Sequence, residues 1–395
     1  MKNKNLLFPF INIGHALDHL AMLIFPTVVL ALAREMDKPY AELLPLTVGG
    51  FIAFGAFSIP AGYLGDRWNR HKMMVVFFFG LGIALAITGM AQSPWQIAAG
   101  LTLVGMFGAI YHPVGNALIV SDPKRMGYIL GVNGLWGNLG LAFAAIISGA
   151  LMDWAGWRMA FFVPAVICIA AGIGFVLLVP DPGPIVKTGK KLGLHMDMRT
   201  AMTIVAVLLV ATCCGGLIFN ATTIAMPKIF DERLRALTDT SLGLGLLVAM
   251  VYTIGAFSQL VVGPLLDKVE LRHLLIPISA AQVAVLFAAG ALEGWPMLIV
   301  SVLMMLAVFG QIPLNDAIVG RYTADEYRAR VFAIRYVVTL GVASLAVPMI
   351  AFLHKREGGF EGVFQVLSVL ALLTLVAAFF FPTRKALQAQ HGEPS

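Results

Sequence analysis

The sequence predicts an all-α membrane protein with twelve transmembrane helices, arranged as two pseudo-symmetric six-helix bundles. Hydrophobic residues make up 59% of the 395 residues and charged residues 12%, about half of the roughly 25% that is typical of soluble globular proteins. Apolar runs long enough to cross a hydrocarbon core of about 30 Å as a helix occur twelve times. A basic motif in one connector returns in weaker form half a chain later, and such internal repeats are common in transporters.

The predicted spans divide the chain into two halves joined by a linker. They cover residues 6–32, 46–65, 73–91, 95–119, 127–151, 158–180, 201–229, 241–266, 271–292, 295–320, 328–353 and 360–382. The longest connector is punctuated by proline and glycine and then becomes basic, which is typical of a linker. The predicted organisation is an amino-terminal bundle (1–180), a cytoplasmic linker (181–200), a carboxy-terminal bundle (201–383) and a cytoplasmic tail (384–395). The charged segment Lys228–Thr240 is predicted to be a short amphipathic outer loop.

Lysine and arginine are distributed unevenly between the two sides of this topology. The termini and the connectors on one side hold 18 of the 27, and the opposite connectors hold 8. Because short cytoplasmic loops are enriched in these cations, both termini are predicted to be cytoplasmic. The net charge of +6 is scattered through the connectors and is not gathered on one face, so nucleic acid is not an expected partner.

The repeated motif is the connector between the second and third spans. It runs from Gly62 through Asp66 and Arg67 to Arg70, and its weaker copy lies 201 residues later at Gly263, Asp267 and Lys268. The connector resembles the loop between helices 2 and 3 of the major facilitator superfamily, and the copy is similar to its degenerate partner between helices 8 and 9. The turn before span 6, from Trp154 to Arg158, is also similar to that family. Spans 1, 4 and 5 resemble the bacterial branch of fosmidomycin-resistance-like exporters.

The resemblance implies a transporter whose two halves rock about a cavity lined by spans 1, 4, 7 and 10. It also implies a conformational latch at the cytoplasmic face. The residues assigned to gating are Gly62, Asp66, Arg67, Arg70, Asp267, Lys268 and Arg335. Arg335 and Asp316 are candidates for a charge pair that closes the inner gate, with a static pair between neighbouring helices as the alternative.

Ionisable residues inside the spans are few, and each costs about 2.5–3.5 kcal/mol even on the lenient insertion scale. Span 1 concentrates them in His15, Asp18 and His19. His15 and His19 are four residues apart and therefore project from one helix face. Since an unperturbed histidine titrates near neutral pH, these three residues are predicted to bind a coupling proton. The alternative is a self-satisfied polar group that braces span 1.

Further polar residues in spans 1, 4, 7 and 10 are predicted to contact substrate. They are Asn12, His19, Tyr111, His112, Asn220, Asn315 and Asp316. Pro113 follows His112 and frees a backbone carbonyl, and such an irregular helix is tolerated where it lines a cavity. A histidine that merely bonds this carbonyl is the alternative interpretation of His112.

The same residues also support a metal hypothesis. His15, His19, Asp18 and His112 offer imidazoles and a carboxylate that suit a divalent transition metal. The run from His15 to His19 is close to the inverted zinc-protease pattern, but aspartate replaces the catalytic glutamate and no third ligand follows by spacing. Hydrolysis is therefore rejected, and no enzyme is expected.

The predicted function is secondary active transport in the bacterial inner membrane, namely proton-coupled export of a small organic molecule or metabolite by alternating access. A transporter of a transition metal or metal chelate is the first alternative, and a non-transporting intramembrane enzyme or sensor is the second. The expected partners are a small-molecule substrate, protons and membrane lipids. No cofactor is expected, and the chain is expected to function as a monomer. No ATP-binding motif occurs, so the energy must come from a gradient or from the substrate itself.

Overall fold

The computed structural model describes residues 2–119, 126–181, 198–266, 268–322 and 325–382. Its twelve long helices are α1 (Leu7–Glu35), α3 (Val48–Arg67), α4 (Arg70–Gly89), α5 (Pro94–Gly108), α7 (Met126–Ala155), α8 (Met159–Leu178), α9 (Met198–Arg233), α10 (Ser241–Leu266), α11 (Leu271–Ala289), α12 (Gly294–Tyr322), α13 (Asp325–Glu357) and α14 (Glu361–Phe379). Short helical segments are η1 (Lys4–Leu6), α2 (Tyr40–Leu43), η2 (Leu44–Thr47), η3 (Tyr111–Gly115) and α6 (Asn116–Ile119). The predicted all-α fold is confirmed, with no strand among the described residues. Most of the predicted linker, and the whole tail, lie outside those residues.

The outer surface of this bundle is apolar, as a lipid-facing surface must be. Eleven helical stretches within the described residues are long and apolar enough to cross a membrane. Large side chains such as Val166, Leu177 and Phe287 are more than 60% exposed. A soluble protein rarely exposes so much contiguous apolar surface. These side chains are therefore placed to contact lipid tails.

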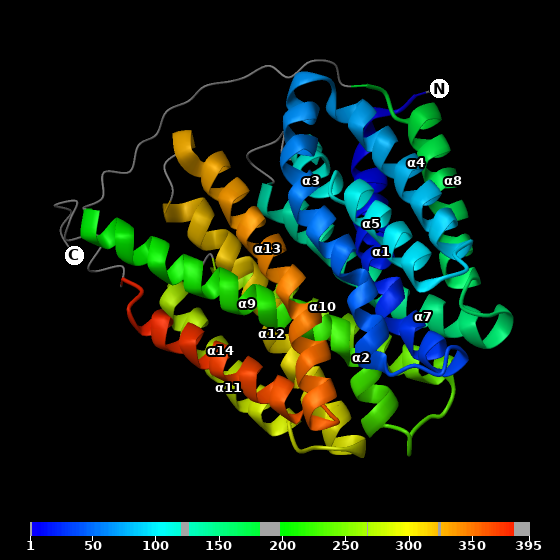
Figure 1. Ribbon diagram of the computed structural model, residues 1–395. Helices are drawn as coiled ribbons and strands as arrows, with labels where there is room; N and C mark the ends of the chain where they lie inside the picture. The colour runs from blue at the N-terminus through cyan, green and yellow to red at the C-terminus, as the bar shows by residue number, and fades with distance from the viewer. Residues whose placement is uncertain (1, 120–125, 182–197, 267, 323–324, 383–395) are drawn as a thin grey trace.

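Each half pairs its helices in the same way. In the first half α1 packs against α7, α3 against α5, and α4 against α8. In the second half α9 packs against α13, α10 against α12, and α11 against α14, which are the equivalent pairs by position in the chain. The junction follows the same symmetry, since α7 packs against α10 and α3 against α13 (Figure 1). The halves are thus structural repeats, as the recurring motif predicted.

The halves are joined at the side that carries the carboxy-terminal end of α1, which we call the junction face and define by Arg34, Asp153 and Ser241. Asp153 at the end of α7 accepts hydrogen bonds from the backbone N–H groups of Ser241 (3.2 Å) and Leu242 (2.7 Å). These residues begin α10, so a carboxylate of one half caps a helix of the other half and lies at the positive end of its dipole. Beside this cap, Gly149 lies directly against the Ser241 carbonyl and leaves no space for a side chain.

We expect Asp153→Ala to weaken the junction, because two backbone donors of α10 would lose their acceptor. Loss of a helix cap costs about 0.5–2 kcal/mol. Thermal unfolding in detergent should show a lower midpoint for Asp153→Ala than for Asp153→Asn, whose amide oxygen still accepts one bond. Equal midpoints for the two variants would contradict a role for this cap.

Candidate functional site

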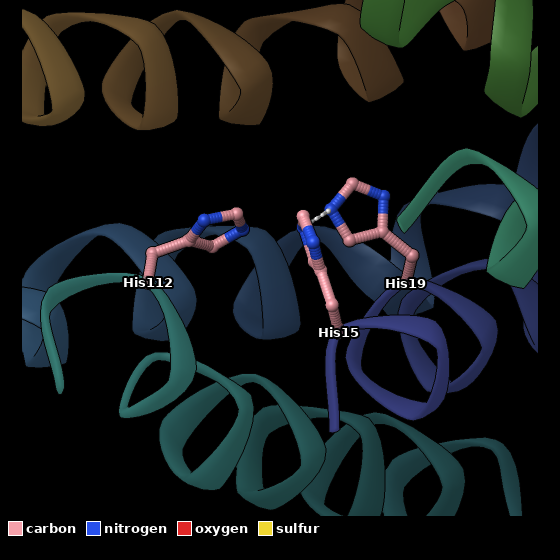
Figure 2. A group of neighbouring side chains, drawn as sticks. All are labelled: His15, His19 and His112. Atoms are coloured by element: carbon pink, nitrogen blue, oxygen red, sulfur yellow. Dashed lines mark hydrogen bonds between the residues drawn. The ribbon is translucent and has the colours of Figure 1, made fainter. Parts of the chain in front are cut away.

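The polar residues of span 1 meet the turn that follows α5 inside the first half (Figure 2). The ring centroids of His15 and His112 are 5.2 Å apart, and those of His19 and His112 are 5.6 Å apart. Nε2 of His15 lies 3.2 Å from Nε2 of His19. Asp18 adds a carboxylate, with Oδ2 3.4 Å from Nε2 of His112. We call these four residues the histidine cluster. The structure brings together residues that are nearly a hundred positions apart in the sequence.

Asp18 is enclosed more completely than any other member of the cluster. Its side chain is 0% exposed, whereas that of His112 is 16% exposed. Within the described residues, neither carboxylate oxygen has a hydrogen-bond partner, and only the His112 imidazole approaches as a potential cation. A Cβ on Gly108 would lie 2.9 Å from Oδ1, so the carboxylate packs against bare backbone. A buried carboxylate without donors is costly, and the His112 imidazole is positioned to offset its charge.

The orientation of His15 is determined by a backbone carbonyl. Its Nδ1 lies 2.7 Å from the carbonyl oxygen of Asn133. A carbonyl only accepts hydrogen bonds, so Nδ1 carries the proton and Nε2 carries a lone pair. The ring stacks on Tyr111 at 4.7 Å with an interplanar angle of 18°. On its other side a Cβ on Gly137 would lie 2.6 Å from Nε2, so the glycine-spaced α7 admits the imidazole.

Asn133 is the member of this site that sequence reasoning missed. Its side-chain nitrogen donates to Asn12 Oδ1 (2.9 Å) and to the Tyr111 hydroxyl (2.8 Å). It therefore links α1, α7 and the turn after α5, while its carbonyl holds His15. An asparagine inside a largely apolar, glycine-spaced span was the available signal. Asn12 and Tyr111, both predicted as substrate contacts, are used in this structure to support the cluster.

The turn that carries His112 is irregular, as Pro113 predicted. The predicted span 95–119 is divided between α5, a π-helical turn at Tyr111–Gly115 and α6. Proline has no N–H to donate to the Ala109 carbonyl. The Ser58 hydroxyl from α3 lies 3.3 Å from that oxygen, and its single proton is shared with the Phe54 carbonyl, which is closer at 2.7 Å.

Of the predicted gating residues of the first connector, Gly62 contacts this same turn and Arg70 contacts the segment that follows it. A Cβ on Gly62 would lie 3.2 Å from Cβ of Pro113, so the glycine allows α3 to touch the turn. Arg70 pairs with Asp66 at 2.6 Å and donates to the Ala117 carbonyl at 3.1 Å. Arg67 lies 4.9 Å from the ring centroid of Tyr63 on its own helix. These contacts all lie within the first half.

The predicted residues of the second half are not members of the histidine cluster, and some of them lie outside the described residues. Asn220 donates to the carbonyl of Gly216 one turn earlier in α9, at 2.8 Å. Asn315 is buried in α12, and its Oδ1 has no hydrogen-bond partner within the described part of the chain. Lys268 is exposed just after α10. Asp267 and the side chains of Asp316 and Arg335 lie outside the described residues. Their gating and substrate roles stay predictions.

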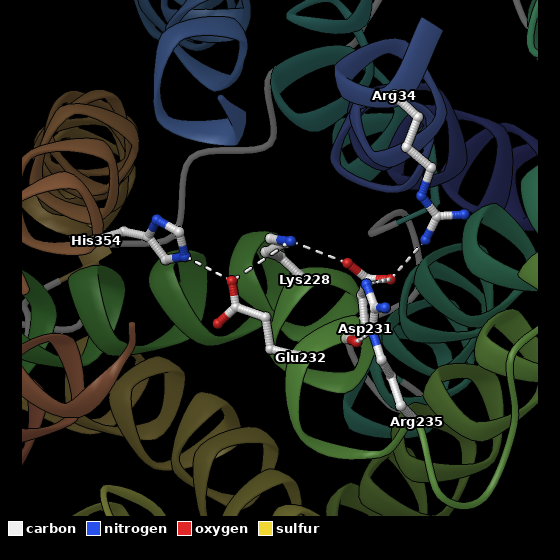
Figure 3. Close-up of polar contacts among 6 residues, drawn as sticks. All are labelled: Arg34, Lys228, Asp231, Glu232, Arg235 and His354. Carbon is white, nitrogen blue, oxygen red and sulfur yellow. Dashed lines mark hydrogen bonds and ion pairs between the residues drawn. The ribbon is translucent and has the colours of Figure 1, made fainter. Parts of the chain in front are cut away.

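A second polar network lies at the junction face (Figure 3). It consists of Arg34, Lys228, Asp231, Glu232, Arg235 and His354. Arg34 of α1 and Asp231 of α9 form a 2.8 Å ion pair that crosses between the halves. Lys228 lies 2.9 Å from Asp231, and His354 lies 2.8 Å from Glu232. We call this group the junction network.

The prediction of a loop at Lys228–Thr240 is wrong for its first half, because α9 continues to Arg233. The charged residues predicted the end of the span. In the structure they lie on one more helical turn, where Arg233 donates to the Gly290 carbonyl at 2.9 Å and Lys228 pairs along the helix. Partners from distant segments stabilise a turn that composition alone assigned to a loop.

The histidine cluster can carry out two kinds of chemistry. Asp18 and His112 can share a proton, and His15 and His19 can pass one along the line of their Nε2 atoms. One nitrogen from each histidine also lies within 4.8 Å of the others, which is a spacing that could hold a metal ion.

Comparison with known proteins assigns the family. The profile described as Major Facilitator Superfamily matches residues 11–238 and 208–395. The multidrug resistance protein MdtG of Yersinia enterocolitica is 25% identical over 348 residues, which are 85% of this chain and 82% of that protein. A probable actinorhodin transporter of Streptomyces coelicolor is 33% identical over 157 residues, covering 38% of this chain and 27% of that protein.

Solved structures share the fold. A bacterial homologue of the human lysosomal transporter Spinster, crystallised in an inward-facing and unoccupied conformation, superposes with a TM-score of 0.77 at 15% identity and covers 99% of both chains. The profile match extends over nearly the whole chain and agrees with the repeated halves. This chain therefore belongs to the major facilitator superfamily, a family of multi-pass membrane transporters and not of enzymes.

Proposed function

We propose that the protein exports a small organic molecule across the bacterial inner membrane by alternating access, driven by protons. The observation that carries this proposal is the position of the buried histidine cluster relative to the junction face. Asp18 is sixteen residues before Arg34 on α1, which at 1.5 Å per residue places it about 24 Å from the junction network. An ionisable site deep in the bundle, with the halves joined on one side of it, is the arrangement that alternating access requires.

The relatives support an organic substrate and export. MdtG is named a multidrug resistance protein, and other relatives are named an actinorhodin transporter and a tetracenomycin C resistance and export protein. The cluster offers aromatic and imidazole rings beside amides, which suits an amphipathic molecule with a polar end. Asn220 and Asn315 of the second half are proposed to contribute further amide contacts when the halves close around the substrate.

The orientation follows from the positive-inside bias. If both termini are cytoplasmic, the junction face is the periplasmic one, so the halves are joined on the periplasmic side in the described conformation. Outward opening would then require separation of Arg34 from Asp231 and release of the α10 cap from Asp153.

Proton coupling is assigned to Asp18 with His15 and His19, with His112 as the neighbour of the carboxyl group. With one proton between them, Asp18 and His112 have no net charge. Either both groups are neutral, or the carboxylate and the imidazolium form an ion pair, and both forms are tolerated inside the bundle. Without that proton the carboxylate is an isolated charge that no described donor satisfies. An unpaired buried charge is strongly unfavourable, so proton loss favours the conformation in which water reaches Asp18.

We expect Asp18→Asn to abolish proton-driven export while the protein still folds, because asparagine keeps the volume of the side chain but cannot release a proton. Proteoliposomes with an imposed pH gradient would be tested against a panel of fluorescent amphipathic dyes. Spin labels across the junction face would report whether the separation of the halves depends on pH. Asp37→Asn, in the exposed turn that follows α1, is the matched control. Wild-type dependence on pH in Asp18→Asn would contradict the assignment.

We expect Arg34→Gln to shift the protein toward separation of the halves at the junction face, because Asp231 would keep only partners from its own half. Arg34 is 61% exposed, so the pair contributes at most about 1 kcal/mol, or about a fivefold change in the conformational equilibrium. The same spin-label distances measure this shift. Arg235→Gln is the control, since Arg235 also approaches Asp231 (3.7 Å) but belongs to α9's own half. An equal effect of both changes would argue against an inter-half latch.

A further inference from the structure

We propose that His15, His19 and His112 form a binding site for a divalent transition-metal ion, with Asp18 as the anion that offsets its charge. Export of an organic molecule does not require such a site, so the inference goes beyond the proposed function. It begins from the distances: one nitrogen of each histidine lies within 4.8 Å of the others, and all three rings turn toward a common space (Figure 2).

The distance between the first two nitrogens already matches that of coordinated imidazoles. Ligand nitrogens at about 2.0–2.1 Å from a tetrahedral ion lie about 3.4 Å from each other. The Nε2 atoms of His15 and His19 are 3.2 Å apart. The helix determines this spacing, because residues four apart lie one above the other on the same face. To complete the ligand set, only the His112 nitrogen must move closer to the other two. The π-helical turn places this histidine where a regular helix would not.

The tautomer of His15 favours a ligand role. Because the Asn133 carbonyl accepts from Nδ1, the Nε2 lone pair is directed at His19. A hydrogen bond from the second ring nitrogen to a carbonyl is the outer contact that metal-binding histidines almost always make. The stacked Tyr111 ring and the close approach of Gly137 hold the imidazole in place. A histidine so constrained loses little conformational entropy when an ion binds.

The surroundings select the class of ion. Three neutral imidazoles suit zinc, copper, nickel or iron, whereas calcium and magnesium prefer sets of oxygen ligands. Asp18 lies 3.4 Å from His112 and supplies negative charge in an otherwise apolar region. His19 and His112 are partly exposed, so an ion can reach the cluster. Three protein ligands leave one tetrahedral position open, and this position would accept a donor atom of a chelating molecule.

The test uses the full chain purified in detergent without a polyhistidine tag. Titration with Zn²⁺, Ni²⁺ and Co²⁺ by calorimetry should give one ion per chain, with a Kd below roughly 10 μM at neutral pH. Mg²⁺ and Ca²⁺ should give no heat of binding. The visible spectrum of Co²⁺ should report tetrahedral nitrogen coordination. His15→Ala, His19→Ala and His112→Ala should each weaken binding by at least about tenfold, since each removes a ligand.

Two controls separate this site from other histidines and from misfolding. His71→Ala removes a histidine of the same half that bonds the Val179 carbonyl far from the cluster, and His273→Ala removes an exposed one. Both variants should bind as the wild type does. The midpoint of thermal unfolding without metal shows whether each cluster variant is folded. If an alanine variant does not fold, the same histidine is changed to glutamine instead.

Saturable binding that survives loss of all three cluster histidines would overturn the proposal, as would the absence of binding to the folded wild type. The measurement is independent of transport. A protein that binds Zn²⁺ through the cluster but exports no dye would retain the metal site and contradict organic export. A protein that exports dye but binds no metal would support organic export and contradict the metal site.

Discussion

The polar groups at the centre of the first half must find every partner inside the protein, because the hydrocarbon that surrounds the bundle offers none. Asp18 is the extreme case, since it is fully enclosed and, among the described residues, its carboxylate has the His112 imidazole as its potential cation and no hydrogen-bond donor. The neighbouring helices carry glycine where they meet this group: Gly108 lies against the carboxylate and Gly137 against the His15 ring. A side chain at either position would separate the helices that bring the cluster together. The glycines that allow α1, α5 and α7 to pack closely are therefore the same residues that make room for the side chains of the site.

The turn around Pro113 connects this site to the basic connector. Because Pro113 has no N–H, the Ala109 carbonyl is left to the Ser58 hydroxyl. The proline side chain packs on Gly62, and the Ala117 carbonyl in the segment that follows accepts a hydrogen bond from Arg70. A change in the turn that moved His112 would thus displace groups that hold the connector. Rigid helices joined by an irregular turn have a natural place to bend, and here that place carries an ionisable side chain.

The two halves share their backbone arrangement but not their chemistry. Helix pairs correspond one to one between the repeats, so packing is conserved across the duplication. The position that carries His19 in the first half carries Asn220 in the second, and Asn220 bonds its own helix. The duplicated scaffold thus carries an ionisable imidazole at this position in one half and an amide in the other.

The sequence by itself determined the class of protein, the order of the spans and the identity of the ionisable groups within them. Hydropathy and the cost of charge in a bilayer are local properties that can be counted along the chain. Helical spacing placed His15 and His19 on one face, and Pro113 marked the irregular turn at His112.

Only the tertiary structure decided which groups those residues meet and which contacts join the two halves. Asn133 is an ordinary amide in its span until α7 packs on α1, and Arg34 and Asp231 pair across 197 residues of chain. The charges at Lys228–Arg233 suggest the end of a helix from composition alone, but Arg233 donates to the distant Gly290 carbonyl and Asp231 pairs with Arg34 of α1. These contacts depend on how helices far apart in the chain pack together, and no local pattern of residues encodes that packing.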